Sequence, residues 1–338
     1  MRKRCIGTKL IAEHVFIFLI FICLLTNEFV YPANKKNKDD TQIPLENKRV
    51  LILGDSITQD GTYISFIDYY LESMFPHRKF DIISIGLSSE TASGLSEPDS
   101  PFLRPCILTR VDHALKEVKP DIVVACYGMN DGIYYPKSPK RFKAFRDGML
   151  KLIIKLKAAV NKIIILTPPV FDPRRIPQKV QKDGAKSYGF SKPYYKYDNV
   201  LEDYSKWIMD IGIKGVEMID LHTRMKEYLK QRQKEDPNFF INKDGVHPSH
   251  LGHLFMAQIF LDGIGIQVHS KDLDYELNKI SADTLFKLVD KQRQIRSKGW
   301  LEYIGYTRGN TVKIDDIEPT KKQVVELQKQ IDAIRQKK

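Results

Sequence analysis

The sequence has few of the features that mark a disulfide-rich, fibrous or multi-spanning membrane protein. Four cysteines in 338 residues are too few for a disulfide scaffold, and 19 glycines and 17 prolines form no collagen-like repeat. A mean hydropathy of -0.34 and one strongly apolar segment exclude a protein with several membrane spans. With 42% hydrophobic and 28% charged residues, the composition is typical of a globular protein with one large domain or two small ones.

Acidic residues are fewer than basic ones. The chain has 42 aspartates and glutamates against 54 lysines and arginines, which gives a net charge of +12. This excess favours solubility, and it also suits surface contact with an anionic glycan or a membrane. No nucleic-acid-binding motif with metal-ligand or aromatic spacing accompanies the charge, so no nucleic acid is expected as a partner.

The first 33 residues have the pattern of a secretory signal. Basic residues precede a short apolar run over 15–25, which is shorter than a membrane span. Ala33 is the best candidate for the cleavage site, and an uncleaved anchor stays open as the alternative. A polar linker follows over 34–47. The sequence therefore predicts an exported protein that is periplasmic, extracellular or anchored to the membrane.

From residue 48 onward, short apolar runs alternate with longer amphipathic stretches. We expect strands at 49–53, 80–85, 121–126, 162–167 and 215–219. We expect helices at 63–75, 107–118, 139–160, 195–211, 222–231 and 251–261. Such alternation, with fully apolar strands, is typical of a parallel sheet covered on both faces. The predicted fold class is α/β, a three-layer α/β/α sandwich with a parallel five-stranded sheet over residues 48–264.

Two segments fall outside this alternation. Pro168–Pro193 is rich in proline, lysine and arginine and has no periodicity, so we interpret it as a rim over the site or as a surface excursion. Residues 265–338 are rich in lysine and carry apolar residues at helical spacing. We expect them to form a C-terminal helical extension that packs on the domain or on a partner.

Polar residues occur in the loops beyond the carboxyl ends of the predicted strands. Active sites in proteins with a parallel sheet lie at these ends. Gly54-Asp55-Ser56 follows the first strand and exposes a hydroxyl, and Gly86 follows the second and offers an unhindered N–H. Asn130 follows the third strand, and its amide can donate to a developing oxyanion. Asp244 and His247 share one loop, where the carboxylate can orient the imidazole toward a serine. Each cluster alone also fits an ordinary turn.

Metal binding is the competing functional interpretation of the last cluster. His250 and His253 lie close to His247 in the chain, so three imidazoles could collect there. No further ligand follows at the spacing of a known metal site. We therefore expect no metal.

Taken together, the four clusters resemble the blocks of the SGNH, or GDSL-type, hydrolase family, and in particular an exported bacterial subgroup of esterases. The resemblance covers about residues 48–262 and includes the strings Gly128-Met-Asn130-Asp131 and Asp244-Gly-Val-His247. Ile57 stands where the family has leucine, and Ser84 stands where the second block often has asparagine. The resemblance implies the flavodoxin-like fold of SGNH hydrolases, without any cofactor.

The resemblance also implies a role for each matched residue. Ser56 attacks an ester carbonyl, His247 takes its proton, and Asp244 fixes the tautomer of His247. The N–H groups of Ser56 and Gly86 and the side-chain amide of Asn130 hold the oxyanion. Water then cleaves the acyl-enzyme with His247 as the base.

The sequence thus predicts a serine esterase, with an acylated carbohydrate that carries O-acetyl groups as the expected substrate. The aromatic residues of 188–197 fit either a rim that stacks on sugars or the packing of the following helix. A lipid acylhydrolase or thioesterase is the alternative enzyme. A non-catalytic surface protein that binds anionic glycan through its lysines is the alternative from another class.

Overall fold

A five-stranded parallel sheet lies at the centre of the computed structural model, which describes residues 43–268, 270, 272–312 and 314–337. The strand order is β2-β1-β3-β4-β5. The strands are β1 (Arg49–Gly54), β2 (Asp81–Ser84), β3 (Ile122–Cys126), β4 (Lys162–Leu166) and β5 (Val216–Ile219). The predicted signal or anchor over 1–33 lies outside the described residues.

The strands form where the sequence has short, β-branched apolar runs. All five residues of β3 are buried, as are all but the first of β1, because helices cover both faces of the sheet. The register pairs Leu51 of β1 with Val123 of β3, and Val123 in turn with Ile163 of β4. The predicted α/β fold with a parallel five-stranded sheet is confirmed.

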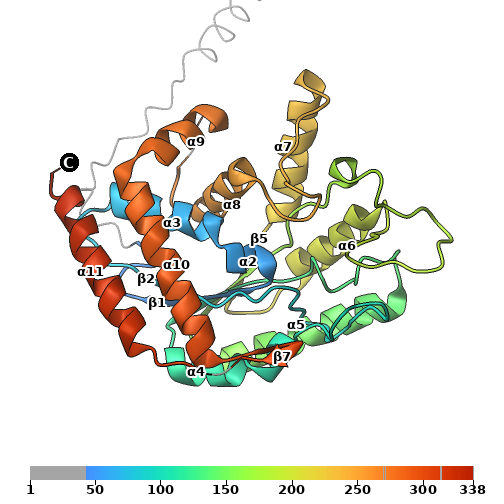
Figure 1. Cartoon of the computed structure of the whole chain (residues 1–338), viewed down its shortest axis with the longest axis horizontal. Helices are drawn as coiled ribbons and strands as arrows, with labels where there is room; N and C mark the ends of the chain where they lie inside the picture. The colour runs from blue at the N-terminus through green and yellow to red at the C-terminus, as the bar shows by residue number, and fades with distance from the viewer. Residues whose placement is uncertain (1–42, 269, 271, 313, 338) are drawn as a thin grey trace, which may run out of the picture. The chain divides into compact units, whose positions relative to one another are not determined.

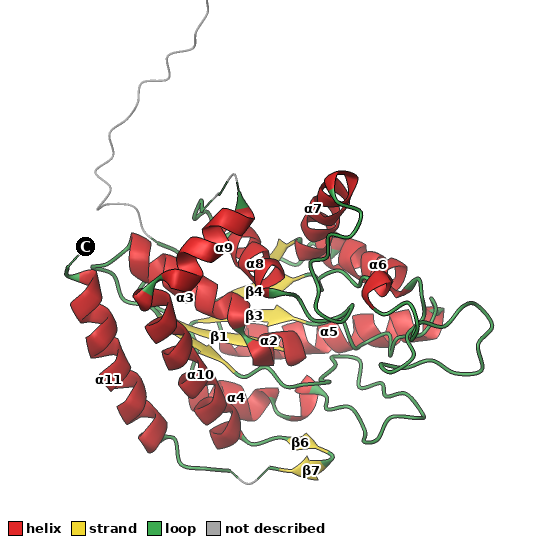
Figure 2. Ribbon diagram, turned by 45° about the horizontal axis from the view of Figure 1, so that its top comes forward, coloured by secondary structure: helices red, strands yellow, loops and turns green. Residues whose placement is uncertain are grey.

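Helices cover the two faces of the sheet, as Figures 1 and 2 show. One face carries α3 (Thr62–Met74) and α8 (His250–Gly263), and the other carries α4 (Val111–Val118) and α5 (Pro139–Ala159). The remaining helices of this part are α2 (Ser56–Asp60), α6 (Tyr197–Asp210) and α7 (Leu221–Glu235). None of the helices within the described ranges is long and apolar enough to cross a membrane.

The start of α4 and the short helix α2 differ from the sequence-based expectation. The helix expected over 107–118 begins as a 3-10 turn at Ile107–Thr109, and α4 starts only at Val111. Arg110, at the junction, is buried and turned toward Glu90. The short helix α2 was not expected, because five residues are too few to show a helical period.

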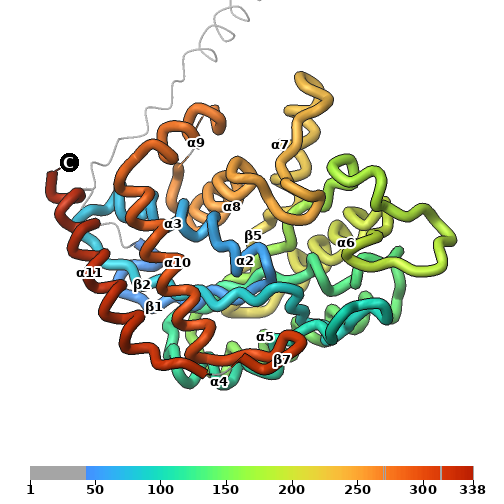
Figure 3. Tube along the Cα trace, viewed as in Figure 1, coloured from blue at the N-terminus to red at the C-terminus, as the bar shows by residue number. Residues whose placement is uncertain are grey.

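The C-terminal part, as far as the structure describes it, consists of three helices and one hairpin. They are α9 (Leu273–Ala282), α10 (Thr284–Ile304), the strands β6 (Thr307–Arg308) and β7 (Asn310–Thr311), and α11 (Glu318–Arg335). Figure 3 shows the chain running along α10, turning through the hairpin and returning as α11 beside α10. We call residues 273–335 the C-terminal extension.

The extension covers the edge of the sheet at β2. The Arg296 guanidinium on α10 donates to the Ile82 carbonyl of β2 at 3.0 Å, and the hydroxyls of Ser297 and Ser84 lie 2.8 Å apart. An uncovered edge strand exposes N–H and C=O groups that can pair with another chain. The extension therefore both adds apolar packing and closes this edge.

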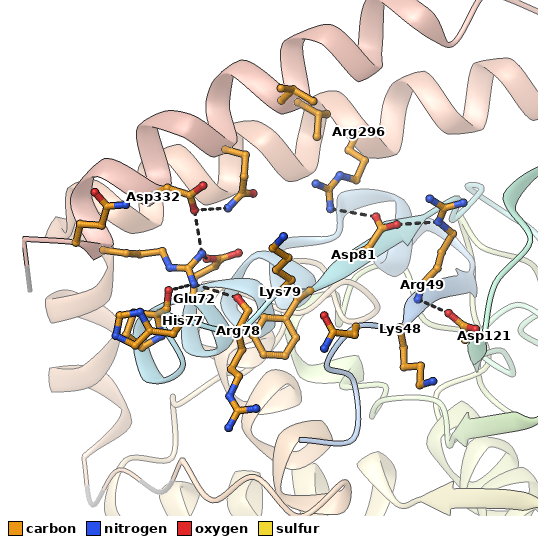
Figure 4. Close-up of a pocket in the computed structure, with 18 of the residues that line it drawn as sticks. Lys48, Arg49, Glu72, His77, Arg78, Lys79, Asp81, Asp121, Arg296 and Asp332 are labelled. Atoms are coloured by element: carbon orange, nitrogen blue, oxygen red, sulfur yellow. Dashed lines mark hydrogen bonds and ion pairs between the residues drawn. The ribbon is translucent and has the colours of Figure 1, made fainter. Parts of the chain in front are cut away.

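A hollow of about 850 Å³ lies between the extension and the amino-terminal ends of β1 and β2 (Figure 4). Ion pairs hold its walls together, with Arg335 of α11 2.6 Å from Glu72 and Arg49 2.7 Å from Asp81. The predicted catalytic residues follow the carboxyl ends of the strands. The hollow therefore lies at the opposite end of the sheet from them.

Candidate active site

Ser56 lies at the tight turn between β1 and α2. A Cβ added to Gly54 would lie 2.2 Å from the hydroxyl oxygen of Thr58, so only glycine allows the helix to start this close to the strand. The Asp55 carboxylate caps α2 by accepting the N–H of Ile57 at 3.0 Å. The turn holds the Ser56 hydroxyl at the carboxyl end of β1.

The fold brings Ser56 together with the two predicted partners from the last loop. Ser56 Oγ lies 2.8 Å from His247 Nε2, across 191 residues of sequence. His247 Nδ1 lies 2.8 Å from Asp244 Oδ2. A proton on Nδ1 satisfies the carboxylate, so Nε2 is left as an acceptor that can take the serine proton.

The loop that carries Asp244 and His247 is held by hydrogen bonds from two sides. Asp244 Oδ1 accepts the backbone N–H groups of Val246 at 3.0 Å and of His247 at 2.8 Å. The carbonyl of Gly245, whose φ is +86°, accepts the N–H of Asp172 at 2.9 Å. The chain after β4 thus fixes the backbone from which the imidazole projects.

The protonation states of Asp244 and His247 suit a general base. Burial alone would raise the pKa of Asp244, but the hydrogen bonds from His247 outweigh it and lower that pKa to about 2. Burial alone would lower the pKa of His247, and its contact with the Asp244 carboxylate raises that pKa instead. Asp244 therefore stays ionised over the whole range in which His247 titrates.

Asn130 is buried beside Ser56 with its amide held in one orientation. Its Oδ1 accepts hydrogen bonds from the Arg104 guanidinium at 3.0 Å and from the Tyr134 hydroxyl at 2.9 Å. Its Nδ2 lies 3.3 Å from Asp55 Oδ2 and 3.3 Å from the Glu90 carbonyl. The NH2 group therefore points toward the serine turn, as an oxyanion donor must.

Arg104 is a residue of this site that sequence reasoning missed. It forms a buried, two-pronged ion pair with Glu97, with both N–O distances at 2.6 Å, and reaches Asn130 with its third nitrogen. Both residues lie in irregular chain, where no periodic pattern marks a buried pair. An arginine and a glutamate seven residues apart were the only signal in the sequence.

The structure places Gly86 apart from the pocket around Ser56. A Cβ added to Gly86 would lie 2.4 Å from the Gln59 nitrogen, and Gly86 lines a neighbouring hollow between α2 and α10. Ser88 and Ser89, further along the same loop, line the pocket with Ser56 instead. Ser89 has a φ of +69°, a left-handed conformation that is uncommon for a residue with a side chain.

A second buried ion pair holds the loop that contains Ser88 and Ser89 in place. The Arg110 guanidinium lies 2.7 Å from the Glu90 carboxylate and donates to the Ile85 carbonyl at 2.7 Å. The Tyr127 hydroxyl also donates to Glu90 at 2.7 Å. These contacts fix the path of the chain between β2 and Ser89.

The pocket around Ser56 has a volume of about 380 Å³. The segment interpreted as a rim contributes Tyr188–Lys192 to its wall, and the ring of Phe190 lies 6.3 Å from that of His247. Phe190 is half-exposed, whereas Tyr197 of the same aromatic stretch is buried and donates to the Met129 carbonyl at 2.9 Å. The stretch thus serves both as rim and as core.

The histidines near His247 do not gather into a metal centre. In the described part of the chain, no three His, Cys, Asp or Glu side chains lie close enough to hold a metal ion. His253 is buried on α8, with its ring parallel to Tyr63 at 6.2 Å, and burial lowers its pKa to about 3. Its role is therefore that of a neutral core residue.

Comparison with solved structures supports the fold. The chain is similar to BT4096, a gut microbial diltiazem-metabolizing enzyme, with a TM-score of 0.52 and 21% identity, over 65% of this chain and 47% of BT4096. It is also similar to a catalytic mutant of Axe2, an acetylxylan esterase from Geobacillus stearothermophilus, with a TM-score of 0.50 and 20% identity, over 68% of this chain and 100% of Axe2.

Comparison of the sequence identifies the family. No curated protein matches the chain. Residues 52–254 match the family described as GDSL-like Lipase/Acylhydrolase, and this region runs from β1 to α8 and contains Ser56, Asn130 and His247. The chain therefore belongs to the GDSL-like lipase/acylhydrolase family, the SGNH hydrolases, and is a carboxylic ester hydrolase.

Proposed function

We propose that this esterase removes acetyl or similarly small acyl groups from carbohydrate. The observation that carries the proposal is the hydrogen-bonded chain from Ser56 through His247 to Asp244, which opens into a pocket of about 380 Å³. Serine, asparagine and charged side chains line this pocket beside the rings of Phe102 and Phe190. Such a wall suits a sugar, which presents hydroxyls at its edge and C–H groups on its faces.

In the first half of the proposed reaction, the acyl group moves to the enzyme. Ser56 Oγ bonds to the ester carbonyl carbon while His247 Nε2 takes the hydroxyl proton. The tetrahedral intermediate then breaks its bond to the sugar oxygen, which takes the proton from His247. The Asp244 carboxylate stabilises the imidazolium between these two steps.

The oxyanion of the intermediate needs donors on the Ser56 side of the pocket. The Ser56 N–H and the amide of Asn130 are two of them in the proposal. Gly86, predicted as the third, lies in the neighbouring hollow, whereas Ser89 lines the pocket. We therefore propose the N–H of Ser89 in place of that of Gly86.

In the second half, water releases the acyl group. His247 takes a proton from water, whose oxygen bonds to the acyl carbon, and then returns the proton to Ser56 Oγ as the acyl–serine bond breaks. The products are a small carboxylic acid and the free enzyme. The chain's own side chains supply every proton transfer in this scheme.

The small size of the acyl group is supported by what surrounds Ser56. The ion pairs of Glu97 with Arg104 and of Asp99 with Lys192 lie in the pocket wall, and a long acyl chain laid against them would remove water from charged groups, which costs free energy. Axe2, a distant structural match, is an acetylxylan esterase. The exported location predicted from residues 1–33 would bring the enzyme into contact with polysaccharide, and it stays a prediction.

The test is acetate release from a panel of acetylated polysaccharides, with the Ser56→Ala protein as the control. The proposal expects release by the wild type and a fall of about 10⁴–10⁶ in kcat for Ser56→Ala. Ser73→Ala, on α3 and outside the pocket wall, should keep full activity. Undiminished acetate release by Ser56→Ala would refute the proposed nucleophile.

A second measurement separates the small-acyl proposal from a lipid acylhydrolase. Nitrophenyl esters of acetate and of a long-chain acid are compared by kcat/KM. The proposal expects acetate to be hydrolysed at least tenfold better. A preference for the long acyl chain would instead favour the lipid acylhydrolase or thioesterase.

A further inference from the structure

The C-terminal extension contributes a residue to the wall of the Ser56 pocket. Arg308 lies on the hairpin of β6 and β7 and lines the same pocket as Ser56, Asn130 and His247. The matched family region ends at residue 254, so the hairpin lies beyond it. This part of the wall is therefore an addition to the family's catalytic region.

Aromatic packing holds Arg308 in place. Its guanidinium lies over the ring of Phe102, 4.7 Å from the ring centre, and the tip of the hairpin at Gly309 also approaches Phe102. The Val312 N–H donates to the Tyr306 carbonyl at 2.8 Å and closes the base of the hairpin. A guanidinium that lies over an aromatic ring still has N–H groups that can donate to a ligand.

Within the described part of the chain, the charges of the pocket wall leave Arg308 without a counterion. The wall holds three cations and two carboxylates apart from His247. Glu97 neutralises Arg104 at 2.6 Å, and Asp99 neutralises Lys192 at 2.9 Å. Among the residues that the structure describes, no carboxylate lies within 4.0 Å of the Arg308 guanidinium, which is exposed.

We propose that Arg308 binds an anionic group on the molecule that carries the ester, and so makes the enzyme selective for acidic substrates. This inference rests on the proposed function, because it places the anion beside an ester bound at Ser56. The fork of the guanidinium fits a carboxylate or a phosphate through two parallel hydrogen bonds. The substrate class is thus an acylated acidic saccharide or an acylated phosphate-bearing polyol.

The experiment compares pairs of substrates that differ only in the charged group. The carboxylate pair is an acetylated oligogalacturonate and its methyl ester. The phosphate pair is monoacetylated glycerol 3-phosphate and monoacetylated glycerol. The readout is the ratio of kcat/KM for the anionic member to kcat/KM for the neutral member, measured at low ionic strength.

The wild type should prefer the anionic member of at least one pair by about tenfold or more, as for a hydrogen bond to a charged group. The pair that shows the preference identifies the source of the anion. Arg308→Gln should bring the ratio close to one, Arg308→Glu should invert it, and Arg308→Lys should restore part of it. Added salt should lower the wild-type ratio, because it screens an exposed charge.

Arg146→Gln is the matched control, because Arg146 also lies over an aromatic ring, that of Phe142 at 4.9 Å, but outside the pocket wall. The Arg146→Gln protein should have the same ratio of kcat/KM for the anionic substrate to kcat/KM for the neutral substrate as the wild type. A wild-type ratio near one in both pairs, or a ratio that Arg308→Gln leaves unchanged, would overturn the inference. Failure to cleave every substrate, including the neutral ones, would instead count against the proposed function itself.

Discussion

At the scale of single residues, the side chain of Asn130 shows how the site depends on groups that hold another side chain in one orientation. Its oxygen is held by Arg104 and Tyr134, and this leaves its NH2 group directed toward the serine turn. Arg104 is in turn fixed by the buried carboxylate of Glu97. In the proposed mechanism, Arg104 is therefore a positioning residue for the oxyanion donor.

A double-mutant cycle tests this role. Asn130→Ala should lower kcat by about 10²–10³, as for the loss of one oxyanion donor. Arg104→Lys keeps the charge beside Glu97 but cannot span Glu97 and Asn130 together, so kcat should fall about tenfold with little change in KM. In the Asn130→Ala protein, Arg104→Lys should cost almost nothing further in kcat.

The control for that cycle is Arg224→Lys, since Arg224 pairs with Asp262 on the surface, outside the pocket wall. Its kcat should match that of the wild type. Additive effects of the two pocket substitutions would show that Arg104 acts on catalysis by a route other than Asn130.

The pH profile reports the state of His247. The base works only when neutral, and contact with Asp244 raises the pKa of His247 above its ordinary value of 6.5. We therefore expect kcat/KM to be constant at high pH and to fall as pH drops, with a midpoint above 6.5. Asp244→Asn should move the midpoint to lower pH and reduce kcat by roughly 10⁴.

The measurement is kcat/KM for 4-nitrophenyl acetate across the pH range, with a correction for its spontaneous hydrolysis. A wild-type midpoint well below 6.5, or a midpoint that Asp244→Asn does not move, would contradict the coupling of the two side chains.

Sequence reasoning found the residues whose chemistry is recognisable and missed those that only geometry selects. Ser56, Asp244, His247 and Asn130 are types that catalysis requires, and the fold brings them together. Gly86 is predicted because a glycine follows the strand there, whereas the residue that we propose from the pocket lining is Ser89, a left-handed residue of the same loop. A backbone angle in a loop is set by tertiary packing and leaves no periodic trace in the sequence.

At the scale of elements, α3 and α8 pack through a buried histidine. The ring of His253 on α8 is stacked on Tyr63 of α3, and its Nε2 lies 3.4 Å from the Asp60 carboxylate. Burial lowers its pKa to about 3, so it stays neutral in the folded protein. An unfolded chain, by contrast, protonates this histidine near pH 6.5.

This difference makes a prediction about acid stability. Because the folded pKa is the lower one, His253 favours unfolding as pH falls from about 6.5 toward 3, by up to about 1.4 kcal/mol per pH unit. His253→Phe keeps an aromatic ring against Tyr63. In this variant the free energy of unfolding should change less with pH over the same range. The check is the free energy of unfolding by urea at several pH values.

His113→Gln, at an exposed position on α4, provides the control and should leave the slope unchanged. An identical pH slope in the wild type and in His253→Phe would show that His253 does not limit stability in acid.

The strands and most helices were predictable because their apolar periods are long enough to recognise. β1, β3 and β4 lie within one residue of the sequence-based ranges. The helical character of 265–338 was also visible, but the hairpin at Thr307–Thr311 was not, since two-residue strands have no period. Its position beside Ser56 depends on contacts across the whole fold.

At the scale of the whole described unit, the extension packs on the sheet domain and reaches the pocket around Ser56. It covers β2 through α10, stacks Phe286 on Phe66 of α3 at 4.8 Å, and carries Arg308 to the pocket. Phe66 is fully buried by this packing. Loss of the extension would expose both an edge strand and an aromatic surface.

Truncation tests this dependence. A chain that ends at Ile266 should aggregate or unfold without cooperativity, because the edge of β2 and the side of α3 become exposed. A chain that ends at Thr311 keeps α10 and the hairpin and should fold with a lower Tm. Soluble yield, gel filtration and thermal unfolding are measured for both truncated chains. Cooperative unfolding of the shorter chain at the full-length Tm would contradict the prediction.

The contact between Arg296 and Ile82 joins residues 214 positions apart, and this has a consequence for synthesis. A ribosome makes the β2 strand long before it makes the helix that shields it, so the nascent chain carries a bare strand for most of its translation. At about 5–20 residues per second, this interval lasts on the order of ten seconds or more. We expect this protein to need a holding chaperone during that interval, and esterase activity to arise only once translation has passed α10.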